Sequence, residues 1–237
     1  MSIFRGYFCE YNLARKKNLV YVRVEMNSQY DMFAHDFSQT RTNAWPEFEV
    51  LLKETKKGDR VLDLGCGNGR LRQSLPVEII RDGDYFGLDV SEKLLEVARK
   101  TFPRDHFFHK DFTRPLPFGD DNFDIVTGVA SFHHILSEAE QKQFLQECCR
   151  TLKPGGTLFL TTWKLPRKHF WTNLWAGNGK NWTIPFGVEK HPRTYRNVTD
   201  KDLKKLLRRA GFEVTFCQLL RDRNYVIVGK KHNGKLF

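Results

Sequence analysis

The sequence has no long apolar run and few cysteines. No stretch approaches the roughly 18 apolar residues that a membrane span requires, and the N-terminus lacks the apolar core of a secretory signal. The chain has five cysteines, and no two of them stand at C-x-x-C spacing. Such an odd, scattered set indicates neither a disulfide framework nor a zinc knuckle. We therefore expect a protein of a reducing compartment, the cytoplasm.

Acidic residues are in the minority. Lys and Arg total 39 against 28 Asp and Glu, which gives a formal net charge of +11. This excess favours a polyanionic partner, although an ordinary basic surface would give the same balance. At 237 residues the chain is long enough for one large α/β domain with a substantial core.

The first 25 residues differ from the rest of the chain. Residues 1–25 combine a basic cluster with the alternation of Val20, Val22 and Val24, which is typical of one strand. Met26 opens a more regular segment, and we hypothesise that native translation starts there, so that residues 1–25 are an extension and 26–237 form the main domain.

After Arg60 the sequence alternates between strand-like and helical segments. The strand-like runs are "RVLDL", "YFGLDV", "HFFHK", "FDIVTGV" and "TLFLTTW". Such alternation predicts a mostly parallel sheet with helices on both faces and ligands at the carboxyl ends of the strands. "KPGG" at 153–156 is typical of a helix stop and a turn, and the last two runs, "EVTFCQLL" and "NYVIVGKK", predict an antiparallel hairpin at the sheet edge.

The stretch "VLDLGCGNGR", residues 61–70, contains Gly65, Gly67 and Gly69 directly behind an apolar run. Glycine permits positive φ and lets a ligand approach the backbone closely. The Gly-Lys-Ser/Thr of a P-loop is absent, and Arg70 stands where a dinucleotide fingerprint requires its third glycine. The remaining pattern, acid-x-G-x-G-x-G from Asp63 to Gly69, resembles the first motif of the class I S-adenosylmethionine-dependent methyltransferases.

This resemblance covers about residues 28–230 and implies a Rossmann-like fold with a seven-stranded, mostly parallel sheet and one antiparallel strand. It implies S-adenosylmethionine as the cofactor, with Asp89, 26 residues after Asp63, binding the ribose hydroxyls. A glycine turn in an unrelated α/β protein is the alternative, and Tyr30 is equally well explained by core packing. The implied cofactor-binding residues are Tyr30, Asp63, Gly65, Gly67, Gly69, Asp89, Val90, Asp111, Phe112 and Val129.

Other stretches resemble one branch of these enzymes, the tRNA wobble-uridine carboxymethyl methyltransferases. They are "YDMFAHDFSQTR" with the following "AWP", and then "SFHHI", "TTW", "RTYR" and "RDRNYVIVGKK". The branch usually has two adjacent tyrosines and a histidine after the arginine, whereas this chain has Thr194, Tyr195 and Arg196, so only Arg193 and Tyr195 are carried over. The resemblance implies tRNA as substrate and a small zinc-binding activator protein as a partner.

The chemistry of the residues agrees with a carboxylate acceptor. A carboxylic acid is already ionised at pH 7, so no general base is required and the enzyme has only to hold it. Arginine pairs bidentately with a carboxylate, which makes Arg41 and Arg193 candidates, and His133 is a candidate hydrogen-bonding partner. The catalytic candidates are thus Arg41, His133 and Arg193, and the substrate-binding candidates are His134, Trp163, Lys164, Arg167 and Tyr195.

Residues 163–196 form an insertion that holds four of the five tryptophans and seven basic residues. Basic groups interleaved with aromatic rings suit a single-stranded, unstacked nucleotide. A lid whose rings pack on the sheet is equally compatible, and "KKLLRR" at 204–209 is either an extension of this basic face or a solvated helix surface.

Two other functions remain open from the sequence. A small-molecule O- or C-methyltransferase of the quinone or phenol type would use His133 or His134 as its base. A catalytically silent subunit would bind the cofactor and lend RNA affinity to a partner.

Overall fold

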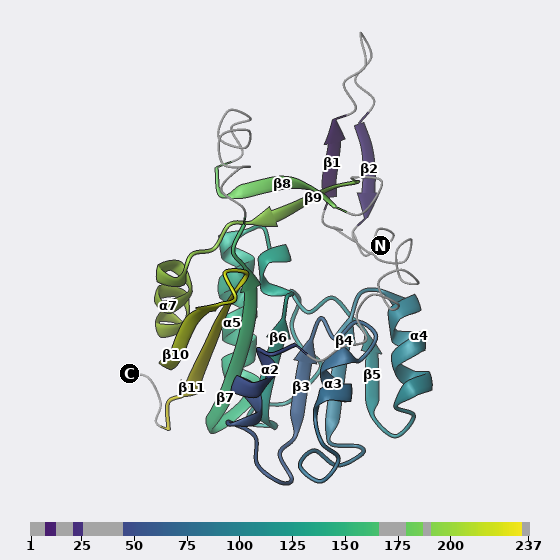
Figure 1. Cartoon of the computed structure of the whole chain (residues 1–237), viewed down its shortest axis with the longest axis vertical. Coiled ribbons are helices and arrows are strands. Elements are labelled where there is room, and N and C mark those ends of the chain that lie inside the picture. Colours follow the sequence, from purple (N-terminus) through teal and green to yellow (C-terminus); the bar gives the residue numbers. More distant parts are fainter. Residues whose placement is uncertain (1–7, 13–20, 26–44, 166–178, 187–190, 234–237) are drawn as a thin grey trace.

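The computed structural model describes residues 8–12, 21–25, 45–165, 179–186 and 191–233. Its centre is a seven-stranded sheet in the order β10-β11-β7-β6-β3-β4-β5 (Figure 1). The strands are β3 (Val61–Leu64), β4 (Tyr85–Asp89), β5 (His106–His109), β6 (Phe123–Val129), β7 (Leu152–Trp163), β10 (Phe212–Leu220) and β11 (Asn224–Lys231).

The pairing confirms the predicted fold class. Strands β3, β4, β5, β6 and β7 pair in parallel, whereas β11 runs antiparallel to both β7 and β10. The sheet therefore has one reversed strand, and the predicted hairpin of β10 and β11 lies at its edge. All four residues of β3 are buried, as expected for a central strand covered on both faces.

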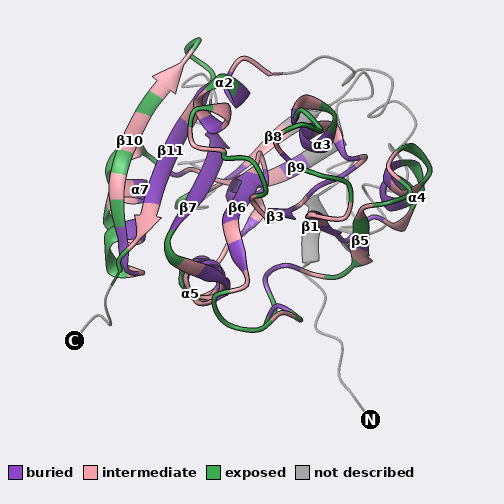
Figure 2. Ribbon diagram, turned by 90° about the horizontal axis from the view of Figure 1, so that it is seen from below, coloured by how far each residue is buried: buried purple, intermediate pink, exposed green. Residues whose placement is uncertain are grey.

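Helices cover both faces of the sheet, and each layer has its own apolar core. Phe144 of α5 (Glu138–Thr151) and Leu203 of α7 (Asp200–Arg209) belong to the cluster on one face. Residues of α2 (Phe48–Leu52), α3 (Arg70–Ser74) and α4 (Glu92–Thr101) belong to the other. Figure 2 shows the buried strands β6, β7 and β11 between these exposed layers.

The two short sheets outside this core differ from the sequence-based expectation. The single strand predicted near residue 22 is β2 (Tyr21–Glu25), and it pairs with a second strand that was not predicted, β1 (Phe8–Asn12). Within the predicted insertion, β8 (Asn181–Phe186) and β9 (His191–Arg196) form another antiparallel hairpin.

The "KPGG" segment also differs from its prediction. α5 ends at Thr151 and β7 begins at Leu152, so residues 153–156 lie inside the strand, although Gly155 keeps the positive φ of a turn, 74°. The bulge where β6 pairs with β7 absorbs these residues. Across the described residues, we find no helix with the length and apolar character needed to cross a membrane.

Candidate active site

The glycine loop between β3 and α3 has a backbone conformation that requires glycine at three positions. Gly65, Gly67 and Gly69 have φ values of 85°, 55° and 82°, a region that residues with a Cβ rarely adopt. A Cβ at Gly65 would lie 2.7 Å from the Cβ of Ser131. The three glycines therefore allow the loop to turn sharply and to pass close to the segment that follows β6.

Asp89 ends β4 beside this loop. One of its carboxylate oxygens accepts a hydrogen bond from the backbone N–H of Gly67 at 2.8 Å, and the other accepts from the N–H of Ser91 at 2.9 Å. Burial raises the pKa of Asp89, while these backbone donors oppose that rise. Each oxygen keeps a second lone pair, so the carboxylate can also accept from a pair of vicinal hydroxyls.

Asp63, at the other side of the loop, is buried against the sheet. Its oxygens accept hydrogen bonds from the Tyr85 hydroxyl at 2.5 Å and the Thr127 hydroxyl at 2.7 Å. Burial raises the pKa of Asp63 to about 6, and the two hydroxyl donors limit that rise. Tyr85 and Thr127 were not predicted as site residues, because they come from β4 and β6 and meet Asp63 only through strand pairing.

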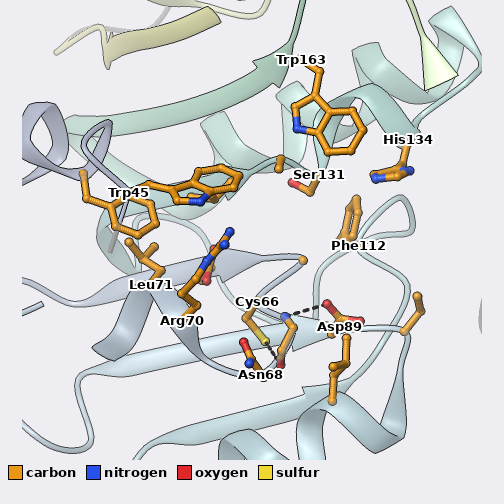
Figure 3. Close-up of a pocket in the computed structure, with 18 of the residues that line it drawn as sticks. Trp45, Cys66, Asn68, Arg70, Leu71, Asp89, Phe112, Ser131, His134 and Trp163 are labelled. Carbon is orange, nitrogen blue, oxygen red and sulfur yellow. Dashed lines mark hydrogen bonds between the residues drawn. The ribbon is translucent and has the colours of Figure 1, made fainter. Parts of the chain in front are cut away.

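A pocket opens over the carboxyl ends of β3, β4, β6 and β7, the edge where α/β sheets bind ligands (Figure 3). It encloses about 910 Å³ of empty space, part of it open to solvent, which is enough for a nucleoside-sized cofactor. The pocket brings together most of the predicted site residues. Those that line it are Asp63, Gly65, Gly67, Asp89, Val90, Phe112, Val129, His134, Trp163, Arg193 and Tyr195.

Four other candidates do not line the pocket. Gly69 immediately precedes α3, where a Cβ would lie 3.0 Å from the Phe102 ring. Asp111 accepts hydrogen bonds from Thr113 in the turn after β5. His133 is buried behind the pocket wall, and Lys164 lies in a neighbouring groove. The remaining candidates, Tyr30, Arg41 and Arg167, fall outside the described residues.

Three aromatic side chains, His134, Trp163 and Tyr195, line one end of the pocket, and His133 packs behind them; we call these four rings the aromatic box. The His133 ring stacks on Trp163 with centroids 4.8 Å apart, and four further pairs among these rings have centroids 4.6 to 5.4 Å apart. Ala130, at φ 53°, turns the chain from β6 into the short helix η1 (Phe132–His134) that supplies both histidines. These planar faces could hold a flat ring against the cofactor site.

The histidines of the aromatic box are weak bases. Burial lowers the pKa of His133 well below its usual range, and burial together with the Arg193 guanidinium lowers the pKa of His134 to about 3. Both rings are therefore neutral at pH 7. Because a general base works best with a pKa near the working pH, neither ring is suited to that role.

Arg193 places a cation at the same end of the pocket. It lies on β9, is 5% exposed and lines the cavity together with Tyr195. Opposite charge is favoured beside a buried guanidinium, whose planar fork matches a carboxylate. This end of the pocket is therefore suited to an anionic group.

The pocket also contains residues that were not predicted. The Arg70 guanidinium lies 4.0 Å from the ring centroid of Trp45, and both side chains line the wall opposite Phe112 and His134 (Figure 3). Trp45 belongs to the "AWP" stretch that carried part of the family resemblance, and Arg70 directly follows the last glycine of the loop. Their positions beside these motifs were the available signals.

Comparison with known proteins agrees with this geometry. Residues 61–156 match a family model described as a methyltransferase domain. Among curated relatives, the tRNA (carboxymethyluridine(34)-5-O)-methyltransferase of Arabidopsis thaliana is 28% identical over 71% of this chain and 41% of its own length. The Schizosaccharomyces pombe protein of the same name is 28% identical over 74% of this chain and 72% of its own length.

Solved structures share the fold at lower identity. A chain from a complex between a Haloferax volcanii methyltransferase activator and a methyltransferase is 21% identical, with a TM-score of 0.69 over 90% of this chain and 100% of that one. A Methanosarcina mazei S-adenosylmethionine-dependent methyltransferase is 20% identical, with a TM-score of 0.68 over 81% of this chain and 100% of its own.

Residues 61–156 match a methyltransferase domain, and the fold is that of class I S-adenosylmethionine-dependent methyltransferases. The match, the fold and the glycine-loop site agree on S-adenosylmethionine as the cofactor. Within that class the chain resembles the tRNA wobble-uridine carboxymethyl methyltransferase branch. The chain spans only 22% to 41% of the length of several curated relatives that it matches, among them the Arabidopsis thaliana protein.

Proposed function

We propose that this chain esterifies the carboxymethyl group of a modified wobble uridine in tRNA. The carrying observation is that the acceptor end of the pocket combines the buried Arg193 cation with His134, a poor base, while His133, buried behind the pocket wall, is also a poor base. The names of the relatives support the same acceptor. A tRNA acceptor also agrees with the basic charge of the chain and with the predicted cytoplasmic location.

Different residues of the pocket bind the methyl donor and the methyl acceptor. S-adenosylmethionine supplies an electrophilic methyl group on a sulfonium centre. Asp89 and the glycine loop hold the donor side, and their positive-φ backbone and second lone pairs fit a ribose and a methionine moiety close to the main chain. Arg193 holds the acceptor carboxylate, which is a nucleophile at neutral pH, and the aromatic box holds the uracil ring.

A quinone- or phenol-type acceptor fits this pocket less well. A hydroxyl or carbon acceptor must lose a proton, and the low pKa of His134 makes that ring a poor proton acceptor. Asp63 is also a poor candidate, because its carboxylate already accepts from Tyr85 and Thr127. The fold by itself does not decide between acceptors, since a cyclase, SpnF, has the same fold at a TM-score of 0.64 and 18% identity.

We also propose a small zinc-binding activator protein as partner. One support is the structurally similar chain from a complex of a methyltransferase with its activator. The other is the position of β5 at the edge of the sheet. β5 is a short edge strand whose terminal residues, His106 and His109, are exposed. Such an edge presents unpaired backbone groups that a partner can cover.

Methyl transfer to tRNA tests the proposed function. Purified protein, with and without an activator protein, receives radiolabelled S-adenosylmethionine and total tRNA from a strain that lacks this gene, and the nucleosides are then analysed by mass spectrometry. We expect a carboxymethyl-uridine ester that is lost with Arg193→Ala. The matched control is Arg81→Ala, an exposed arginine before β4 at the amino edge of the sheet. Cofactor binding without incorporation into tRNA, with the activator present, would contradict the proposal.

A further inference from the structure

A second cavity opens on the other side of two pocket residues. Trp45 and Trp163 line the active-site pocket and also a groove bounded by the segment before α2, the end of β7 and the turn between β10 and β11. The groove encloses about 1460 Å³ of empty space, much of it open to solvent. Two indole side chains are therefore shared between the acceptor pocket and an adjacent groove.

The β10–β11 turn that forms one wall has an unusual backbone. Arg221 and Asp222 have φ values of 51° and 54°, and the N–H of Arg223 donates to the carbonyl oxygen of Leu220 at 3.0 Å. Two successive positive φ values define a turn that normally carries glycine or asparagine. A strained turn with bulky residues persists where the surrounding structure holds it, and such strain is typical of functional sites.

The end of β7 holds the turn in place. The backbone N–H of Lys164 donates to the carbonyl oxygen of Arg223 at 2.8 Å, and the Lys164 ammonium pairs with the Asp222 carboxylate. This ion pair uses the only acidic side chain of the turn. The conformation therefore exposes Arg221 and Arg223 while it neutralises Asp222.

The charge of the groove is positive where the turn faces solvent. Among the described residues, neither the Arg221 nor the Arg223 side chain forms a hydrogen bond or an ion pair, and both are exposed. Glu47, the other acid of the groove, is buried, and its carboxylate accepts a hydrogen bond from Asn224 at 2.7 Å. Two uncompensated guanidinium groups thus stand beside two indole faces, the combination that binds single-stranded nucleic acid.

We propose that this groove binds the nucleotide adjacent to the methylated uridine. This inference rests on the proposed RNA acceptor. The target base enters the aromatic box, the neighbouring base lies against the indole wall formed by Trp45 and Trp163, and Arg221 and Arg223 hold the phosphate backbone. The shared tryptophans then separate two successive bases of one strand.

Binding of a ten-residue oligouridylate tests this groove without any methyl transfer. Fluorescence anisotropy at several salt concentrations compares the full-length chain with a double variant, Arg221→Gly and Arg223→Ala. Glycine accepts the positive φ at position 221, so the turn should keep its shape. Arg81→Ala is the control for loss of one exposed positive charge far from the groove.

We expect the double variant to bind the oligonucleotide about five- to tenfold more weakly. The slope of log affinity against log salt should become shallower by at least about 0.7, the share of one single-strand phosphate contact. Arg81→Ala and the affinity for S-adenosylmethionine should stay unchanged. If Arg221→Gly lowers the melting temperature, Arg223→Ala alone repeats the comparison with the backbone of the turn intact.

The two proposals fail in different ways. An unchanged affinity and salt slope in the variants, while the unaltered chain binds oligouridylate, would overturn the groove assignment and leave the proposed acceptor standing. Binding of S-adenosylmethionine with no binding of RNA by the unaltered chain would overturn both.

Discussion

The hydroxyl of Tyr85 donates a hydrogen bond to the carboxylate of Asp63 across 2.5 Å, beneath the glycine loop. Both residues are buried, one at the start of β4 and the other on β3. Burial raises the pKa of Asp63 to about 6 even with this bond in place, and the bond limits the rise. It links the ionisation of the loop acid to a tyrosine that does not line the pocket.

Replacing Tyr85 with phenylalanine should raise the pKa of Asp63 further, because one donor to its ionised form is lost. We expect the loss of a hydrogen bond to a charged group to reduce the free energy of unfolding by about 1.5 to 3 kcal/mol. As the pH is lowered, Asp63 should become protonated earlier in the variant. Titration calorimetry should therefore show that cofactor affinity begins to weaken at a higher pH than in the unaltered chain. An identical pH dependence of binding in both proteins would contradict this role.

The pH dependence of methyl transfer should be flat between pH 7 and 9. The proposed carboxylate acceptor is ionised throughout this range, and His134, with a pKa of about 3, stays neutral. The measurement is the initial rate at saturating substrate. A limb that fits a single group titrating within this range would favour an acceptor that needs a base.

His134 should make the protein less stable in mild acid. Its folded-state pKa of about 3 lies below the unfolded value of 6.5, so the unfolded chain binds the extra proton and stability is lost as pH falls through 6.5. From pH 7 to 5.5 this loss is about 1 kcal/mol. Urea unfolding should show a smaller pH effect, by that amount, in His134→Gln. Asp63 acts in the opposite sense, because its raised pKa destabilises the fold as pH rises from about 4 to 6.

Gly65→Ala should abolish cofactor binding and destabilise the fold by about 2 kcal/mol or more. The new Cβ would combine a left-handed φ of 85° with a 2.7 Å contact to Ser131. Gly58→Ala is the matched control, since its φ is 87° but nothing lies within 4 Å of the new Cβ. The difference between the two variants in chemical unfolding isolates the steric clash. Equal losses would mean that backbone strain alone accounts for the effect.

Features that depend on local sequence were predictable. The runs of β3, β4, β5, β6 and β7 were all located, since each contains consecutive apolar or aromatic residues between turn or helical segments. The glycine loop and Asp89 were singled out through the family resemblance, and both lie at the carboxyl ends of neighbouring strands, β3 and β4. The reversed strand was foreseen from two runs joined by a short link.

Features that depend on contacts between distant segments were not predictable. Tyr85 reaches Asp63 only through the register of β3 and β4. β8 has apolar residues at every second position, Trp182, Ile184 and Phe186, but β9 has no such alternation, and the hairpin within the insertion was missed. The sequence also could not show that Lys164 lies outside the pocket, because its ion pair with Asp222 depends on a turn 58 residues away.

The single reversed strand has a consequence for how such an enzyme can change its acceptor. Because β11 runs against β7, its first residue and the preceding turn lie beside the end of β7, at the reaction edge. A parallel β11 would have sent that turn to the opposite edge. Under the proposed function, residues 61–112 hold the methyl donor, and the η1, β9 and hairpin segments, which line the same pocket, hold the acceptor. We expect that exchanging the second set of segments would change the substrate while the first set continues to hold the same methyl donor.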